Sequence, residues 1–248
     1  MLFRRSMLAL AALPAGRRAA GSPAEPGGGG VSAGSPATAA EAGPPALSPA
    51  QVVLFETPHL ASVRPPVRLD YAFRRDEAGK PTVEDSIRLA VRASAEEGRR
   101  DVAVEFLTGA RAIRYPPATG FRGNPLLLFA LDRQTRELSA ATGGSATWFR
   151  NRIRRALAGG AELRPATVEL DGRPLAATEI LLTPFAGEPR AGRYRAMRFA
   201  VRLAEEVPGR IHAIRTDLPA GEDGGAVAES IVFTGAAPLP EAPEGTAR

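Results

Sequence analysis

The densest group of chemically active side chains in the sequence is a tryptophan followed by four arginines, with no acid in the same predicted helix. Arg150 and Arg154, four residues apart, would share a helix face and could bind a phosphate or carboxylate together. The segment therefore predicts a contact with an anionic partner, a ligand or a membrane surface. A solvated polar face, held by ordinary salt bridges, is the alternative. The candidate contact residues are Trp148, Arg150, Arg152, Arg154 and Arg155.

Groups suited to catalysis are few. The chain has no cysteine, which excludes disulfides, zinc fingers and thiol nucleophiles, and it has only two histidines, His59 and His212. We expect one hydrogen-bonded structural histidine and one exposed histidine, because no motif supplies the oriented partner that a general base needs. The adjacent acids Glu96–Glu97 and Glu205–Glu206 would diverge on a strand. The sequence predicts no catalytic residue, no metal and no cofactor.

The net charge of +5 and the pI near 10.5 suggest a nucleic-acid partner, but the distribution of the charge does not support one. Four arginines lie in the first twenty residues, which contain no acid, and without them the net charge falls to +1. A nearly balanced remainder argues against nucleic acid as a partner.

The first residues are typical of an export signal. Arg4–Arg5 precede a short apolar run from Met7 to Ala15, far too short to span a bilayer, and the arginine pair resembles the twin-arginine export motif. We expect an export signal over residues 1–20 and a disordered linker rich in Ala, Gly and Pro over 21–47. A single domain over 48–236 and a disordered tail over 237–248 would follow. This organisation predicts a periplasmic or secreted protein with no transmembrane span.

The domain is organised around a predicted helix pair between Asn124 and Gly160. Asn124 would cap the first helix, and glycine pairs at 143–144 and 159–160 would end the two helices. The predicted apolar stripes are Leu127, Leu128, Leu131 and Leu138 in the first helix, and Phe149, Ile153, Ala156 and Leu157 in the second. The spacing places Asp132, Arg133, Arg136 and Glu137 on the solvated side.

Alternating apolar residues predict strands before and after these helices. The first group comprises 69–73, 83–91, 102–106 and 110–115, with Pro116–Pro117 ending the fourth strand. The second comprises 167–170 and 173–176, which flank an Asp171–Gly172 hairpin turn, then 180–182, 197–203, 211–215 and 227–233. Hairpin-length connections favour one antiparallel sheet with the helix pair on one face, an α+β domain.

Several short motifs carry a family resemblance. They are Phe55-x-x-Pro58-His59-Leu60, Leu69-Asp70-Tyr71-x-Phe73, Gly123-Asn124-Pro125, Phe149-Arg150-Asn151-Arg152-Ile153-Arg154 and Val207-Pro208-Gly209. In this order, across residues 50–235, they resemble a group of exported bacterial proteins with no assigned function. The layout is similar, more distantly, to the LolA-like half-barrels of periplasmic lipoprotein carriers. That likeness implies a curved sheet with a concave apolar face, able to hold an acyl chain or a hydrophobic peptide.

The expected function is therefore binding without catalysis. The ligand would be apolar, a lipid or hydrophobic peptide, or the partner would be a protein of the cell envelope. The alternative is a periplasmic hydrolase that uses carboxylate or histidine chemistry at the open end of the sheet. A deep apolar cleft beneath the helices would favour binding, whereas a polar cleft that gathers His59 with carboxylates would favour catalysis.

Overall fold

The computed structural model describes residues 46–240. Every element below belongs to the unit that begins at Leu47. The predicted export signal and nearly all of the predicted linker lie outside the described residues, as do residues 241–248 of the predicted tail.

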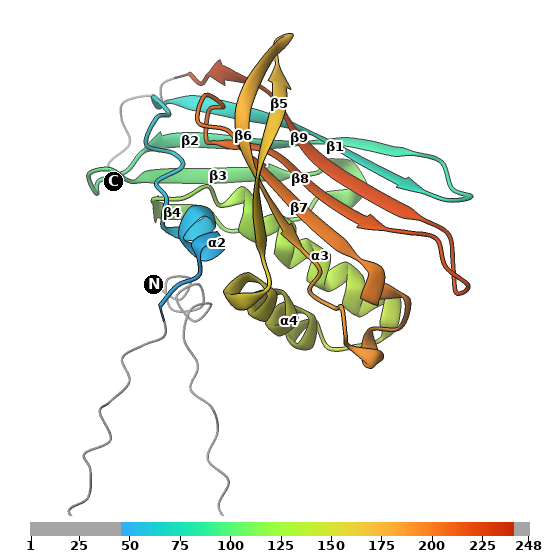
Figure 1. The fold of residues 1–248 in the computed structure, drawn as a ribbon. Coiled ribbons are helices and arrows are strands. Elements are labelled where there is room, and N and C mark those ends of the chain that lie inside the picture. The colour runs from blue at the N-terminus through green and yellow to red at the C-terminus, as the bar shows by residue number, and fades with distance from the viewer. Residues whose placement is uncertain (1–45, 241–248) are drawn as a thin grey trace, which may run out of the picture. The chain divides into compact units, whose positions relative to one another are not determined.

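All nine strands of the described residues join one antiparallel sheet (Figure 1). In chain order they are β1 (Val67–Glu77), β2 (Val83–Ala93), β3 (Arg100–Phe106), β4 (Ala118–Phe121), β5 (Glu162–Leu170), β6 (Arg173–Leu182), β7 (Arg198–Leu203), β8 (Ile211–Leu218) and β9 (Val227–Pro238). Their order in the sheet is β4-β3-β2-β1-β9-β8-β7-β6-β5. The sheet is curved and unclosed, with β4 and β5 as its edges. The predicted antiparallel α+β fold is confirmed.

Short and long helical segments complete the unit. They are α2 (Pro49–Gln51), the π-turn η1 (Val52–Glu56), the 3-10 segments η2 (Gly109–Arg111) and η3 (Pro189–Ala196), and the long helices α3 (Leu126–Thr142) and α4 (Ala146–Gly159). The two long helices lie together on one face of the sheet (Figure 1). Because they connect β4 to β5, the helix pair links one edge of the sheet to the other.

The inward face of the sheet follows the predicted alternation. Leu69, Tyr71 and Phe73 of β1 are each at most 2% exposed, and the residues between them face outward. The β5–β6 turn has left-handed backbone at Asp171 (φ 52°) and Gly172 (φ 73°), as a two-residue hairpin requires. The hairpin prediction is therefore confirmed.

The predicted strand over Ala110–Tyr115 is wrong. The chain leaves β3 through left-handed backbone at Leu107 (φ 63°) and Gly109 (φ 55°), which breaks the extended run and leads into η2. Ile113 makes a single bridge to Phe106, and the fourth strand forms only after the two prolines, as β4. Proline lacks the N–H group that a sheet ladder needs, so the prolines separate the bridge from the strand.

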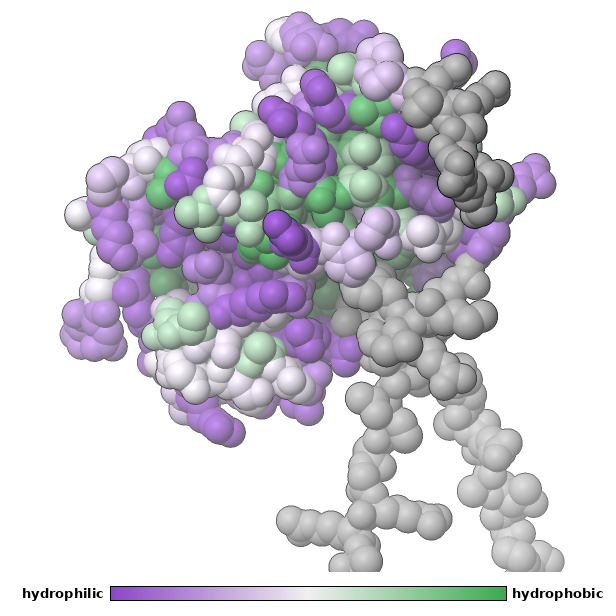
Figure 2. All heavy atoms as spheres, turned by 180° about the vertical axis from the view of Figure 1, so that it is seen from behind, coloured by the Kyte–Doolittle hydropathy of each residue, from purple (hydrophilic) through white to green (hydrophobic). Residues whose placement is uncertain are grey.

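The core lies between the sheet and the helix pair. Phe129 and Leu138 of α3, Phe149 and Ile153 of α4, and the inward side chains of the strands form one buried cluster. Burial of each large apolar side chain stabilises the fold by about 1.5–3 kcal/mol. Apolar side chains also reach the surface: on the face behind that of Figure 1 they show among hydrophilic ones across the middle of the unit (Figure 2).

Candidate functional site

Four buried residues from separate segments meet at the start of α3. Asn124 is at the centre: its Nδ2 donates to the Gly209 carbonyl at 3.0 Å and to the Tyr71 hydroxyl at 3.3 Å. Its Oδ1 accepts the backbone N–H of Leu126 at 3.1 Å, which confirms the predicted cap. The backbone N–H of Asn124 donates to His59 Nδ1 at 3.4 Å. We call His59, Tyr71, Asn124 and Gly209 the polar junction.

The polar junction joins four of the short motifs of the sequence. Each of its members comes from a different motif, the segments 55–60, 69–73, 123–125 and 207–209. The junction therefore ties the first turn segment, the central strand, the helix start and the β7–β8 turn to one another. Each of its three side chains has at least one hydrogen-bond partner within the junction, as buried polar groups generally do.

Gly209 shows how closely these segments approach. Its backbone is left-handed (φ 75°), and a Cβ placed there would lie 2.9 Å from Leu69 Cδ1 and 3.0 Å from Asn124 Nδ2. Both separations are below ordinary van der Waals contact, so the position requires glycine for its space as well as for its backbone angle.

His59 is part of the packing between the first turn segment and the start of α3. It is 1% exposed, and its Nε2 bonds the Val53 carbonyl at 2.8 Å while Nδ1 accepts from Asn124. Burial lowers the pKa of His59, and the nearby charge of Arg210 lowers it further, against the opposing effect of the Val53 bond. The neutral ring fits both neighbours, with Nε2 as donor and Nδ1 as acceptor. The predicted hydrogen-bonded structural histidine is confirmed at this position.

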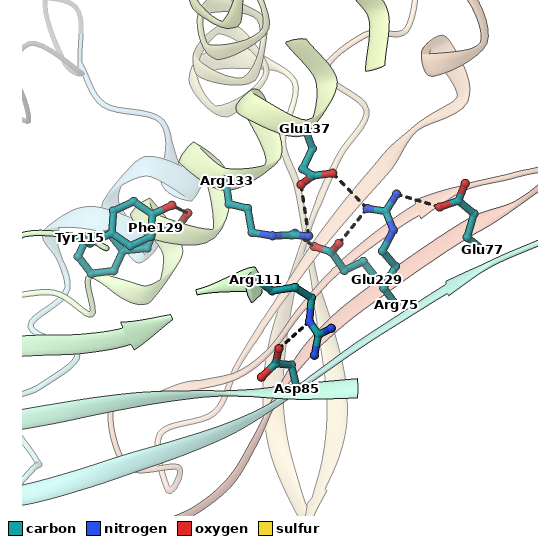
Figure 3. Close-up of polar contacts among 9 residues, drawn as sticks. All are labelled: Arg75, Glu77, Asp85, Arg111, Tyr115, Phe129, Arg133, Glu137 and Glu229. Carbon is teal, nitrogen blue, oxygen red and sulfur yellow. Dashed lines mark hydrogen bonds and ion pairs between the residues drawn. The ribbon is translucent and has the colours of Figure 1, made fainter. Parts of the chain in front are cut away.

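A second polar group lies farther along α3 (Figure 3). Arg133 of α3 contacts Glu229 of β9 at 2.5 Å, and Arg75 of β1 contacts the other oxygen of Glu229 at 3.4 Å. Glu137, one turn beyond Arg133, lies 3.6 Å from Arg75 and 3.8 Å from Arg133. Glu77 completes the set at 3.2 Å from Arg75. We call these five residues the interlayer clamp, because they join α3 to the two central strands.

The prediction that Arg133 lies on the solvated side of its helix is wrong. The residue is 6% exposed, and its guanidinium carbon lies 4.9 Å from the centre of the Phe73 ring. Its apolar stem packs in the core while its charge meets Glu229. Helix periodicity assigns a face by polarity, so it cannot detect an arginine whose partner is 96 residues away.

The loop 107–117 covers the sheet beyond the end of β4. It is anchored at one side by Arg111, whose Nε donates to Asp85 at 2.8 Å (Figure 3). Burial of Asp85 opposes its ionisation, but hydrogen bonds from Thr108, Ser86 and Arg111 prevail and lower the pKa of this carboxyl to about 2. The start of the loop is therefore fixed to β2.

The other side of the loop rests on apolar contacts. Tyr115 stacks on Phe129 of α3, with ring centres 4.5 Å apart, and meets Phe106 of β3 edge-on at 5.5 Å. Its hydroxyl donates to the Phe129 carbonyl at 3.1 Å. Because β4 pairs with β3 only at Arg100 and Val102, the inward side chains beyond that point depend on the loop for cover. The partly buried apolar side chains at this edge are Val104, Ile113, Tyr115 and Phe121.

The candidate contact residues of α4 have different neighbours. Trp148 is stacked on Phe185 at 6.1 Å, half-buried, with the guanidinium of Arg152 5.5 Å from its ring. Arg152 also pairs with Glu188. Arg150 turns toward α3, where it lies 3.4 Å from Asp132.

The last two arginines of the helix differ in their surroundings. Burial lowers the pKa of Arg154, and the charge of Arg150, four residues earlier in the helix, lowers it further. Arg155 is exposed. The structure thus brings Trp148 and Arg152 together and sets Arg150 apart.

No family model matches the chain, and no curated protein matches it. Solved structures similar to it include the lipoprotein LppX of Mycobacterium tuberculosis, at 13% identity and a TM-score of 0.31, covering 67% of this chain and 84% of that one. A LolA superfamily protein of Nitrosomonas europaea follows at 10% identity and 0.23, covering 78% and 94%. A domain of Vibrio parahaemolyticus named for outer-membrane lipoprotein sorting has 8% identity and 0.21, covering 72% and 87%. One of these structures belongs to the LolA superfamily, the group that the layout of the sequence resembles.

Two kinds of site are not found in residues 46–240. No three His, Asp or Glu side chains there are grouped so that they could hold a metal ion. None of the helices in that range is long and apolar enough to cross a membrane. Among the polar groups that join α3 to the sheet are the polar junction and the interlayer clamp.

Proposed function

We propose that this protein binds an apolar ligand, a lipid chain or a hydrophobic peptide, between the sheet and the helix pair. The observation that carries the proposal is the edge beside β4. There the apolar interior is covered by loop 107–117 and not by a strand, and Val104, Ile113 and Tyr115 remain partly exposed. A loop that rests on ring contacts can move aside at lower cost than a strand held by a hydrogen-bonded ladder.

The ligand would enter by displacing Tyr115. This ring bridges the two layers, since it contacts Phe106 of the sheet and Phe129 of the helix. An acyl chain placed there would exchange one set of apolar contacts for another, while the Arg111–Asp85 pair keeps the loop attached. The closed arrangement would then be the ligand-free state.

The proposal includes a role without catalysis, in the cell envelope. Both ring nitrogens of His59 are occupied by hydrogen bonds, which leaves that ring no nitrogen for proton transfer. Export rests on the N-terminal pattern of Arg4–Arg5 followed by an apolar run, in residues outside those described. In place of an apolar ligand, the protein would bind another protein of the cell envelope.

The test uses the fluorescent apolar probe N-phenyl-1-naphthylamine, together with native mass spectrometry of the purified full-length protein. We expect saturable probe binding and a co-purified lipid mass. Ile113→Arg should weaken probe binding by about tenfold or more, because a charge would have to be buried at the opening. Tyr115→Ala should strengthen it, because the cover becomes smaller.

The matched control is Val52→Arg. Val52 is an apolar residue of η1 that is 44% exposed, so the same substitution there adds a charge away from the opening. It should leave probe binding unchanged. Absence of probe binding by the wild-type protein, or equal losses in Ile113→Arg and Val52→Arg, would refute the proposal. Cooperative thermal unfolding of each variant shows that the probe reports on folded protein.

A further inference from the structure

The fold brings a second arginine-rich segment to the basic helix. The segment 185–198, which contains η3 and precedes β7, lies beside α4 (orange in Figure 1). Phe185 stacks on Trp148, Glu188 pairs with Arg152, and the guanidinium of Arg190 lies 6.0 Å from the Trp148 ring. Trp148 therefore has the guanidinium groups of Arg152 and Arg190 within 6.0 Å of its ring, although the two arginines lie 38 positions apart in the chain.

Together the two segments hold the positive charge of the protein. Residues 146–159 and 185–198 contain eight arginines and one acid, Glu188, a net charge of +7 in 28 residues. The other 220 residues contain 24 basic and 26 acidic residues, a net charge of −2. The charge of the chain is thus strongly uneven, with a net positive charge in these 28 residues and a small net negative charge in the rest. The eight arginines are Arg150, Arg152, Arg154, Arg155, Arg190, Arg193, Arg195 and Arg198.

Within the structure this charge is only partly neutralised. Arg150 and Arg152 have acidic partners, Asp132 and Glu188. Arg193 donates instead to backbone carbonyls, those of Asp223 and Gly225, and Arg195 donates to the carbonyl of Gly192. A carbonyl orients a guanidinium group without cancelling its charge, so these arginines keep their full attraction for an anion.

The surface also has the shape and the composition of an interfacial site. Trp148, Arg152 and Arg155 follow one another at spacings of four and three, so they form one stripe along α4. On the segment 185–198, a shallow and open recess is lined by Arg193, Arg195 and small residues. Guanidinium groups around a recess suit a phosphate, and an indole at the margin suits the boundary between head groups and acyl chains.

From these observations we propose that α4 and the segment 185–198 form a docking face for an anionic lipid bilayer. The arginines bind the phosphates of the head groups, and Trp148 lies at the interfacial level. The assignment is to a bilayer because the charge is spread over two elements around an aromatic ring, which matches a surface of many phosphates. The docking face does not require an internal apolar ligand, so this proposal and the one above fail separately.

The test is sedimentation of the full-length protein with vesicles of phosphatidylglycerol and phosphatidylcholine in equal parts, against vesicles of phosphatidylcholine alone. Trp148 is the only tryptophan in the chain, so its emission reports on this face without background. We expect binding only to the anionic vesicles, a shift of Trp148 emission to shorter wavelength, and loss of both in 0.5 M salt. Screening at that salt would shorten electrostatic reach to roughly 4 Å.

The test variant is Arg155→Glu/Arg190→Glu/Arg195→Glu, three exposed positions on the docking face. The control is Arg64→Glu/Arg88→Glu/Arg122→Glu, three exposed arginines outside the docking face and loop 107–117, with the same change in net charge. Each basic residue near an anionic surface contributes about 1 kcal/mol, so the test variant should bind at least about 100-fold more weakly while the control stays within a few-fold of wild type. Both keep the arginines of the N-terminus, whose contribution cancels.

Three outcomes would overturn the proposal. The first is no binding of the wild-type protein to anionic vesicles. The second is an equal loss in the test and control variants, which would mean that only net charge matters. The third is a Trp148 shift with millimolar inorganic phosphate or an acidic peptide and none with vesicles, which would assign the face to a soluble anion or a protein. If the test variant fails to fold, the same three positions changed to Gln provide the comparison.

Discussion

The polar junction and the interlayer clamp both join α3 to the sheet through polar groups, but with different chemistry. The junction uses neutral groups only: an amide, a phenol, an imidazole and backbone atoms. The clamp uses charge, and with Lys80 on Glu77 at 2.6 Å its three cations match three carboxylates. A network of neutral hydrogen bonds is satisfied in only one geometry. Buried ion pairs stabilise the fold only while every charge has a partner of opposite sign. We therefore expect the junction to be sensitive to shape and the clamp to be sensitive to charge.

The largest expected effect comes from breaking the clamp at its most buried contact. Arg133→Met should lower the free energy of unfolding by about 3 kcal/mol, the lower end of the range for a broken buried pair, because Arg75 still faces Glu229. Chemical denaturation monitored by circular dichroism measures the loss. Arg133→Met/Glu229→Gln should recover part of it, because the orphaned carboxylate is gone.

The exposed pair Arg173–Glu206 is the matched control for this comparison. Its side chains are in solvent and 2.7 Å apart, so Arg173→Met should change the free energy of unfolding by less than about 1 kcal/mol. Equal losses in the buried and exposed pairs would show that burial does not distinguish the clamp from surface charge.

The junction should respond to one added methyl group. Gly209→Ala should destabilise the fold by about 2 kcal/mol more than Gly187→Ala, measured by thermal unfolding. Both glycines are left-handed, with φ of 75° and 77°, but a Cβ at Gly187 meets nothing within 4 Å. The backbone cost of about 1–2 kcal/mol is therefore shared, and the difference isolates crowding against Asn124. Equal losses at the two glycines would mean that the close approach has no energetic weight.

The smallest expected effect is a dependence of stability on pH through His59. Its pKa is lowered in the folded state, so the unfolded state binds more protons once the pH falls below about 6.5. Stability that is present at pH 7 should therefore decrease towards pH 5, since a proton on Nδ1 would oppose the N–H of Asn124. His59→Gln should be less stable at pH 7 and show a flatter profile between pH 7 and pH 5. Identical slopes in the two proteins would exclude this role.

Much of the fold follows from local patterns in the sequence. Alternation identified the inward residues of β1 and β7, and Asp171–Gly172 located the β5–β6 turn, because these signals depend only on neighbouring residues. Glycine pairs placed the ends of both long helices for the same reason. The misplaced fourth strand shows the limit: left-handed backbone at Leu107, a residue with no special preference for it, redirected the chain.

The candidate site was less accessible to sequence reasoning. Asn124 was expected as a helix cap, but nothing in the sequence indicates that the same amide also binds Gly209, 85 residues away. The pairing of Arg133 with Glu229 spans 96 residues, and helix periodicity pointed the other way. The short motifs did carry information about the junction, since four of them contain the residues that meet there. Only the register of the sheet shows that these four motifs lie next to one another in space.

The pairing of β1 with β9 has a consequence for how the chain comes together. These strands share the middle of the sheet, so the longest ladder in the domain joins residues that are some 160 positions apart. When only β1 to β4 of a nascent chain have been synthesised, β1 is an unpaired edge strand. Its pairing with β9 is slow to form, because the two strands are far apart in the sequence. A chain truncated before Val227 would lack β9 and would therefore form two separate half-sheets, with β1 and β8 as additional unpaired edge strands. We expect such truncated chains to self-associate through these edges.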